Sequence, residues 1–176
     1  MIEAEPNNFL LSLFRIYLNT ILKQSFKGVY FLNELPELDA DKALLLLPNH
    51  MSWWDGFFVD LINRKCLKRN QYIMMLEEQL RKFMFFRKFG VYSINQKDED
   101  DIESSLKYTI DKLQDKQNCV IMFPQGELIP YDKRPVMFKR GGMKFLLNHS
   151  EKVFQILPVA CKIQFYTERK PEVIVN

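Results

Sequence analysis

A histidine and an aspartate at short spacing are the clearest candidates for acid–base chemistry in this sequence. His50 lies just after an apolar stretch, residues 43–47, that is ended by Pro48, and Asp55 lies five positions further on. A carboxylate that accepts a hydrogen bond from one imidazole nitrogen fixes the tautomer, and the other nitrogen can then take a proton. We therefore predict that His50 is a general base and that Asp55 orients it.

A second candidate is the turn Phe123-Pro124-Gln125-Gly126-Glu127, which follows another apolar stretch. Proline and glycine force a turn and allow the backbone to approach a ligand closely. Backbone N–H groups exposed in such a turn could bind a developing oxyanion. Considered alone, the segment is better explained as an ordinary turn at the end of a strand.

Predicted strands and helices, which must position these residues, alternate along the chain. This alternation predicts a single α/β domain with a largely parallel, mixed sheet flanked by helices. His50 would then lie at the carboxyl end of a strand, where sites form in open α/β sheets. We expect strands at 43–47, 72–76, 90–94, 119–123, 154–164 (interrupted at Pro158) and 172–175, and helices at 52–63 (with Ser52 as N-cap), 77–88, 98–115 and 141–148.

Residues 9–26 carry apolar side chains at helical spacing, but Arg15 interrupts the run, which is too short to span a bilayer. Two interpretations remain open: a helix packed on the domain, or an amphipathic helix in a membrane interface. We divide the chain into an N-terminal amphipathic helical segment, 1–25, and a catalytic domain, 26–176. The final residues resemble a strand, which leaves open whether the domain is complete at its C-terminus.

Bulk composition limits the possible functions. The 176 residues are 47% hydrophobic and 27% charged, with a net charge of +3. Basic residues are spread out and nearly balanced by acidic ones, which argues against a nucleic-acid partner. Cys66, Cys119 and Cys161 have no metal-binding or disulfide spacing, and the first residues are acidic where a signal peptide would be basic, so we expect none. These features favour the cytosol or the inner face of a membrane.

The pattern Asn-His-x-Ser-x-x-Asp at 49–55 and the later Phe-Pro-x-Gly turn at 123–126 resemble the glycerolipid acyltransferase family, typified by 1-acylglycerol-3-phosphate acyltransferases. Three further segments, 90–95, 138–141 and 156–159, occur in the order expected for that family. The resemblance extends from residue 26 to the C-terminus. The pattern at 49–55 is the most specific part of this resemblance.

The resemblance implies that a lipid hydroxyl, deprotonated by His50, attacks an acyl-CoA or acyl carrier protein thioester, with no metal or bound cofactor. It also implies a peripheral position on the cytoplasmic face of a membrane. The aromatic and basic segment 81–89 suits a lipid headgroup interface, although one buried helix face would explain it equally well. Beside His50 and Asp55, the expected substrate-binding residues are Asn49, Ser52, Asn95, Gln96, Phe123, Pro124, Gln125, Gly126, Glu127 and Lys139.

The chain departs from the family pattern where arginines are associated with the acceptor phosphate. Gln96 and Leu128 replace those arginines, Gln125 replaces a glutamate and Glu127 replaces a threonine. One interpretation is an acceptor without phosphate there, such as a glycolipid or an aminolipid. The other is that a phosphate is bound by a different cation. The candidates are Lys97, Lys133, Arg134, Lys139 and Arg140.

Two other functions remain compatible with these residues. His50 and Asp55 could activate water, which would make the protein a thioester hydrolase. Alternatively, the altered Phe-Pro-x-Gly segment could mark a lipid-binding module without activity. The presence of both His50 and Asp55 argues against this last interpretation.

Overall fold

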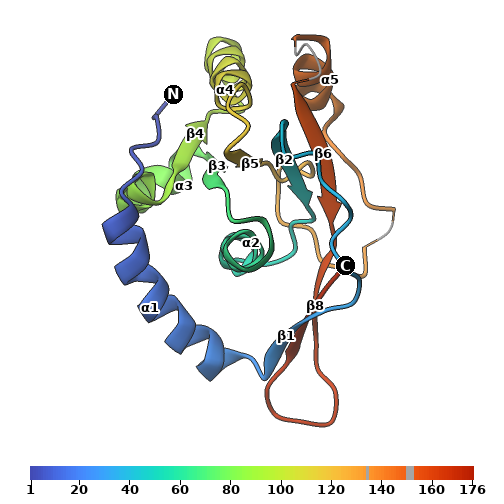
Figure 1. The fold of residues 1–176 in the computed structure, drawn as a ribbon. Coiled ribbons are helices and arrows are strands. Elements are labelled where there is room, and N and C mark those ends of the chain that lie inside the picture. The colour runs from blue at the N-terminus through green and yellow to red at the C-terminus, as the bar shows by residue number, and fades with distance from the viewer. Residues whose placement is uncertain (134, 150–152) are drawn as a thin grey trace.

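The computed structural model describes residues 1–133, 135–149 and 153–176, and it contains two β-sheets (Figure 1). The larger sheet is entirely parallel and has the strand order β4-β3-β5-β2-β6. The smaller sheet has the order β1-β8-β7, with one parallel and one antiparallel pair. The strands are β1 (Gly28–Phe31), β2 (Ala43–Pro48), β3 (Asn70–Leu76), β4 (Val91–Ile94), β5 (Asn118–Ile121), β6 (Phe154–Val159), β7 (Cys161–Gln164) and β8 (Glu172–Val175).

Strand β2 lies inside the larger sheet and is apolar throughout because both faces of the sheet are covered. Leu45 pairs with Val120 of β5 on one side and with Ile156 of β6 on the other. Its side chain belongs to a core cluster on the face covered by α4 (Glu99–Lys112) and α5 (Arg140–His149). Leu44 and Leu46 point to the opposite face, as the twofold periodicity of a strand requires.

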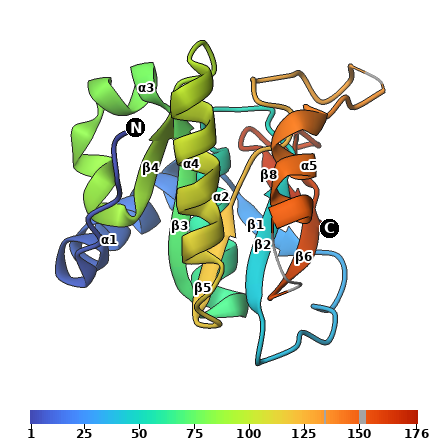
Figure 2. The same cartoon turned by 90° about the horizontal axis from the view of Figure 1, so that it is seen from above.

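Helix α2 (Asp55–Ile62) covers that opposite face and is followed by a π-helical turn, η1 (Asn63–Leu67). Its Val59 packs on the larger sheet, whereas Phe58 packs toward α1 and the smaller sheet. The view from above shows α4 and α5 side by side on the other face (Figure 2). This layered arrangement confirms the predicted α/β class.

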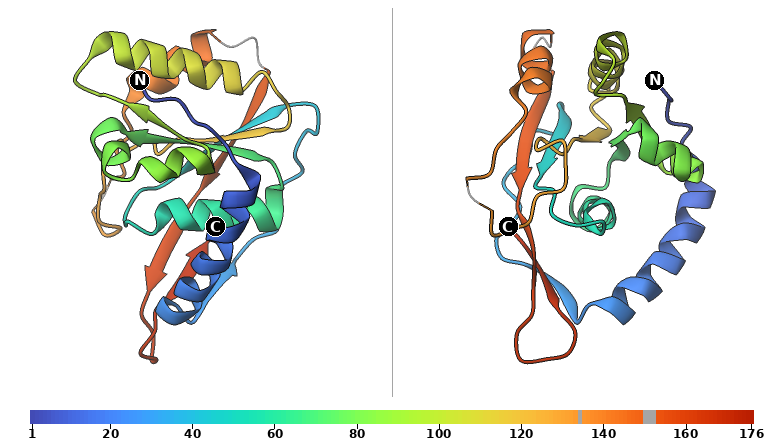
Figure 3. Two further views of the ribbon diagram at one scale, coloured as in Figure 1. Left: turned by 90° about the vertical axis from the view of Figure 1, so that its left-hand side faces the viewer. Right: turned by 180° about the vertical axis from the view of Figure 1, so that it is seen from behind.

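The N-terminal helix α1 (Asn8–Ser25) is amphipathic, as predicted, and joins the smaller sheet through β1 (Figure 3). Leu18 and Leu22 are buried in a cluster with residues of α2 and β8. Arg15 donates two hydrogen bonds, of 2.9 and 2.6 Å, to the buried carboxylate of Asp60. The opposite face exposes large apolar side chains, among them Phe9 (71% exposed). Among the described helices, none is both long and apolar enough to cross a bilayer.

Two of the predicted helices have wrong bounds. The segment 77–88 is two helices, α3 (Glu77–Lys82) and the 3₁₀-helix η2 (Met84–Phe89). They are separated at Phe83, whose φ of −130° and ψ of 54° are not helical. The helix expected from Ser52 begins instead at Asp55, and Ser52 lies in the preceding turn, where its hydroxyl is bonded to Asp55.

Two strand predictions also need correction. Pro158 lies inside β6, and the strand ends one residue later, at Val159. Proline is tolerated there because β6 is an edge strand of the larger sheet. The strand Gly28–Phe31 was not predicted, because its pairing with β8 joins segments far apart in the sequence.

Candidate active site

The ends of adjacent strands bring the two predicted motifs together. Strands β2 and β5 pair side by side in parallel, and His50 follows β2 just as Phe123 follows β5. The imidazole of His50 stacks on the phenyl ring of Phe123, with ring centroids 4.2 Å apart and an interplanar angle of 26°. The His50 side chain keeps 26% of its surface exposed. A partly exposed imidazole on an aromatic support is thus available to a substrate.

The carboxylate of Asp55 is the partner of His50 and is almost completely buried, at 1% exposure. Its Oδ2 atom accepts hydrogen bonds from His50 Nδ1 (2.9 Å) and from the backbone N–H groups of Met51 (2.7 Å) and Ser52 (2.8 Å). Its Oδ1 atom accepts one from Ser52 Oγ at 2.8 Å. Because Nδ1 donates to the carboxylate, Nε2 is the imidazole nitrogen that can accept a proton.

The tight turn between β2 and α2 explains this arrangement. Asp55 is the first residue of α2, so its carboxylate lies over the N–H groups of the residues just before the helix. Acidic side chains are favoured in this position. The Ser52 hydroxyl donates a hydrogen bond to Asp55, and the contact with substrate expected for Ser52 stays a prediction.

Asn49 anchors the segment that carries His50. Its Nδ2 donates to the carbonyl of Cys161 at 3.0 Å, and its Oδ1 accepts from the N–H of Cys161 at 2.6 Å. Cys161 begins β7, directly beyond the end of β6. The Asn49 side chain therefore ties the His50 loop to the junction of the two sheets.

Gln125, which follows the neighbouring strand β5, holds the same loop. The backbone N–H of His50 donates to Gln125 Oε1 at 2.6 Å, and Gln125 Nε2 donates to the His50 carbonyl at 3.4 Å. The same carbonyl accepts from the N–H of Ile129 at 2.9 Å. Gln125 is 4% exposed. Its amide thus pairs with the His50 backbone from a buried position.

The turn at 123–127 is closed by its own hydrogen bond. Gly126 has a φ of +70°, and its N–H donates to the carbonyl of Phe123 at 3.0 Å. Its N–H group is therefore not free to bind an oxyanion. Within the turn, Pro124 is buried and Glu127 is exposed.

The segment that follows β4 contacts this turn through Gln96. Gln96 Nε2 donates to the carbonyl of Gly126 at 3.3 Å, and Lys139 Nζ donates to Gln96 Oε1 at 2.7 Å. The side chain of Asn95 instead forms a hydrogen bond within its own segment, since its Oδ1 accepts from the N–H of Lys97 at 3.1 Å. Arg134, another candidate cation, lies outside the described residues.

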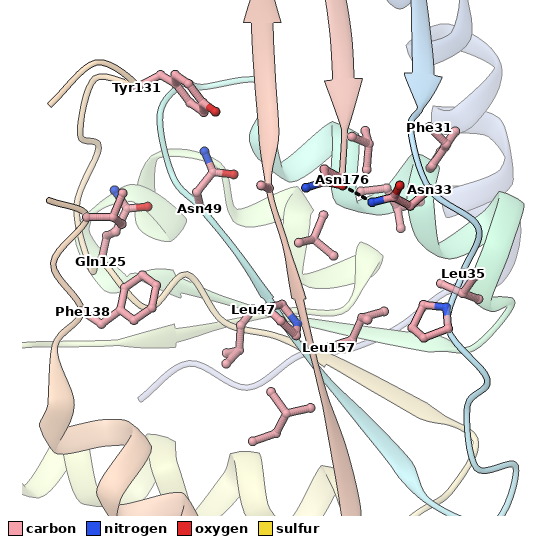
Figure 4. A pocket seen from close by; sticks show the side chains of 18 of the residues that line it. Phe31, Asn33, Leu35, Leu47, Asn49, Gln125, Tyr131, Phe138, Leu157 and Asn176 are labelled. Carbon is pink, nitrogen blue, oxygen red and sulfur yellow. Dashed lines mark hydrogen bonds between the residues drawn. The ribbon is translucent and has the colours of Figure 1, made fainter. Parts of the chain in front are cut away.

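An apolar pocket of about 790 Å³ adjoins the loop that carries His50 (Figure 4). Its walls come from the end of β1 and the segment after it, with Phe31 and Leu35, and from the segment with Tyr131 and Phe138. The wall also includes residues of the edge strand β6. Sequence reasoning missed this pocket because its lining residues come from distant segments and form no local pattern. The pocket meets the His50 loop at Asn49 and Gln125, whereas His50 and Asp55 do not line it.

The family of the chain follows from these features and from comparison with known proteins. A family model described as Acyltransferase matches residues 29–162, which include His50, Asp55 and the turn at 123–127. The chain therefore belongs to the acyltransferase family of the 1-acylglycerol-3-phosphate O-acyltransferase type. No curated protein sequence matches it significantly.

Proposed function

We propose that this acyltransferase moves a fatty acyl group from a thioester to a hydroxyl of a lysophospholipid or a related lipid-like acceptor. The donor would be acyl-CoA or an acylated carrier protein. The observation that carries the proposal is the pair His50–Asp55, in which the buried carboxylate binds Nδ1 and leaves Nε2 as the nitrogen that can act as a base.

In the proposed reaction, His50 Nε2 removes the proton of the acceptor hydroxyl as its oxygen attacks the thioester carbonyl carbon. The imidazolium that forms is stabilised by the carboxylate of Asp55, 2.9 Å from Nδ1. When the tetrahedral intermediate collapses, the carbon–sulfur bond breaks and the imidazolium returns the proton to the thiolate. The acceptor supplies the nucleophile, so no enzyme serine or cysteine is acylated, and no metal or bound cofactor is required.

The apolar pocket beside the site supports a substrate with a fatty acyl chain. Phe31, Leu35, Leu157 and Phe138 line a volume of about 790 Å³. Pockets with mostly apolar walls and a few convergent polar groups are typical of ligand sites. An acyl chain in this pocket would end near Asn49, next to His50.

We also propose that the protein lies on a membrane surface, at the cytoplasmic face. Helix α1 exposes Phe9, Ile16 and Tyr17, at 71%, 66% and 62%, and Trp53 near the site is 59% exposed. Apolar and aromatic side chains on one face of an amphipathic helix favour a lipid interface. Flotation with anionic vesicles tests this: the parent should be retained, and a variant with Phe9→Ser and Ile16→Ser should be retained less. Absence of the parent from the vesicle fraction would contradict this proposal.

The decisive assay measures thiol release from acyl-CoA and from acyl carrier protein thioesters with defined lipid acceptors, and identifies products by mass spectrometry. The parent should form an acylated lipid, and His50→Ala should lower its rate by about 10² to 10⁴-fold, as expected for loss of a general base. Thiol release without an acylated product would instead indicate a hydrolase. No His50-dependent activity with any acceptor would indicate a lipid-binding module.

A further inference from the structure

Helix α1 meets helix α2, which carries Asp55, through a buried polar contact. Arg15 of α1 donates one hydrogen bond from Nε (2.9 Å) and one from Nη2 (2.6 Å), and both are accepted by Oδ1 of Asp60 in α2. Asp60 is 5% exposed, so its carboxylate is almost completely removed from water. A charged group in such a place needs a counter-charge and hydrogen bonds nearby, and Arg15 supplies both.

Arg64 is a second cation beside Asp60, but its geometry is poorer. Its Nε atom lies 3.6 Å from Asp60 Oδ2, which is too far for a hydrogen bond. In the part of the chain that the structure describes, neither of these two buried atoms has a hydrogen-bond partner. Arg64 donates instead from Nη2 to Asn19 of α1, at 2.5 Å. Among the described residues, Arg15 is therefore the hydrogen-bond donor that fixes the Asp60 carboxylate.

Asp60 and Asp55 belong to the same short helix, α2, which has eight residues. Asp55 is the first of them, and its Oδ2 accepts the hydrogen bond of 2.9 Å from His50 Nδ1. A helix of roughly two turns moves as one body, so a shift of α2 at Asp60 also displaces Asp55. The hydrogen bond to His50 weakens once its two atoms separate beyond about 3.2 Å. Small movements of α2 are therefore enough to misplace the imidazole.

Helix α1 precedes the residues that the family model matches, 29–162. It also has apolar contacts with α2, since Leu18 and Phe58 belong to one buried cluster. Apolar packing fixes a distance but little direction, whereas two hydrogen bonds from a planar guanidinium fix an orientation. The contact between Arg15 and Asp60 thus specifies how α2 lies against α1.

We propose that Arg15 is a positioning residue for the transfer reaction. By binding Asp60 it fixes helix α2, and with α2 it fixes the Asp55 carboxylate that orients His50. Helix α1 is then part of the catalytic framework as well as the helix that exposes an apolar face. This inference rests on the proposed acyl transfer at His50.

Initial rates of the full chain with palmitoyl-CoA and 1-acylglycerol 3-phosphate test the role of Arg15. Arg15→Gln should lower kcat about tenfold, because displacement of a catalytic group by about 1 Å can cost up to 10²-fold. The KM of each substrate should stay within about twofold, because no substrate contact is lost. Arg15→Lys, which keeps the charge and one donor, should lie between the two.

Arg81→Gln is the matched control. Arg81 also donates from Nε to a carboxylate, that of Glu77 at 2.9 Å, but its side chain is 66% exposed. Its loss should leave kcat at the level of the parent. Equal kcat values for Arg15→Gln and Arg81→Gln would overturn the inference.

The Asp55→Asn background shows whether Arg15 acts through Asp55. That change alone lowers kcat, and adding Arg15→Gln should lower it by less than about twofold more, since effects on one shared function are not additive. A further loss as large as that in the parent background would show that Arg15 acts by another route.

A double substitution separates position from stability. Arg15→Met with Asp60→Leu removes both charges and leaves apolar side chains, a change that is often neutral or stabilising for a buried ion pair. Thermal unfolding should therefore resemble that of the parent, while kcat stays about tenfold lower because the oriented hydrogen bonds are gone. A kcat equal to that of the parent would overturn the positioning role.

Hydrogen exchange tests the same inference without any activity. In Arg15→Gln the amides of residues 51–58 should exchange faster than in the parent, and those of 119–121 in β5, which report global opening, should not. Unchanged exchange at 51–58, or equally faster exchange at both places, would overturn the inference. The expected pattern in a protein that transfers no acyl group would contradict the catalytic proposal alone.

Discussion

The side-chain amide of Asn49 exchanges two hydrogen bonds with the backbone of Cys161, 112 residues further along the chain. This pairing resembles one rung of a β-ladder, with a side chain in place of one strand. It joins the end of β2, which carries His50, to the first residue of β7. His50 is therefore positioned by the junction of the two sheets as well as by its own loop.

Replacing Asn49 with alanine should lower both stability and activity. The change removes both bonds and leaves the N–H and carbonyl of the buried Cys161 without these partners, at a cost of about 1–3 kcal/mol. Chemical denaturation and initial rates measure the two effects. Asn49→Asp, which keeps one acceptor but loses the donor, should lie between alanine and the parent. A parent-like Asn49→Ala variant would show that the loop needs no such anchor.

Loss of the Ser52 hydroxyl should reduce kcat without changing KM. Ser52→Ala removes the hydrogen bond of 2.8 Å to Asp55 Oδ1, while the three contacts of Oδ2 remain. Hydrogen bonds to charged groups contribute about 1.5–3 kcal/mol, so thermal stability should also fall. A rise in acceptor KM with constant kcat would instead support the predicted role of Ser52 in substrate binding.

Gln125 should act as a positioning residue. Gln125→Leu removes the acceptor for His50 N–H and the donor to His50 carbonyl, so kcat should fall at least about tenfold with little change in KM. Gln125→Glu keeps the acceptor and should retain more activity than leucine. Equal losses for the glutamate and leucine variants would contradict this interpretation of the amide pairing.

Substitution by alanine should change the free energy of unfolding in opposite directions at Gly126 and at Gly56. Gly126 has a φ of +70°, a left-handed conformation that costs alanine about 1–2 kcal/mol, and its new Cβ would also meet Lys139. Gly56 lies in α2 with no atom within 4 Å of an added Cβ, so alanine should stabilise the helix by about 0.5–1 kcal/mol. Urea unfolding of both variants measures the difference. A destabilised Gly56→Ala protein would reveal a constraint on α2 that its geometry does not show.

The cysteines should differ in reactivity toward a thiolate-directed reagent. Burial raises the pKa of Cys119 and of Cys161 to about 12, so both remain neutral thiols at pH 8 and should not react in the folded protein. Raising the pH toward 9 leaves both below their pKa values and should not change this result. Cys66 is half-buried and lines the apolar pocket, so it should be the first to be modified.

The same experiment tests the pocket. An acyl chain bound between Phe31 and Phe138 should slow modification of Cys66, because the thiol lines the same volume. Mass spectrometry of labelled peptides, with and without acyl-CoA, measures the protection. Unchanged labelling of Cys66 under saturating acyl-CoA would place the acyl chain elsewhere.

The amino-acid sequence by itself determined the features that depend on short-range order. The contact of His50 with Asp55 follows from a tight turn over five residues, and the alternating apolar segments specified most strands and the α/β class. Local patterns predict such features because residues close in sequence are held close in space whatever the rest of the chain does.

Tertiary structure decided the contacts between distant segments. The roles of Asn49 and Gln125, expected to bind substrate, depend on partners 112 and 75 residues away. The apolar pocket and the placement of Lys139 over Gly126 likewise require particular strands and loops to become neighbours. These features have no periodic signature, because strand pairing and side-chain packing select the partners only when the whole domain folds.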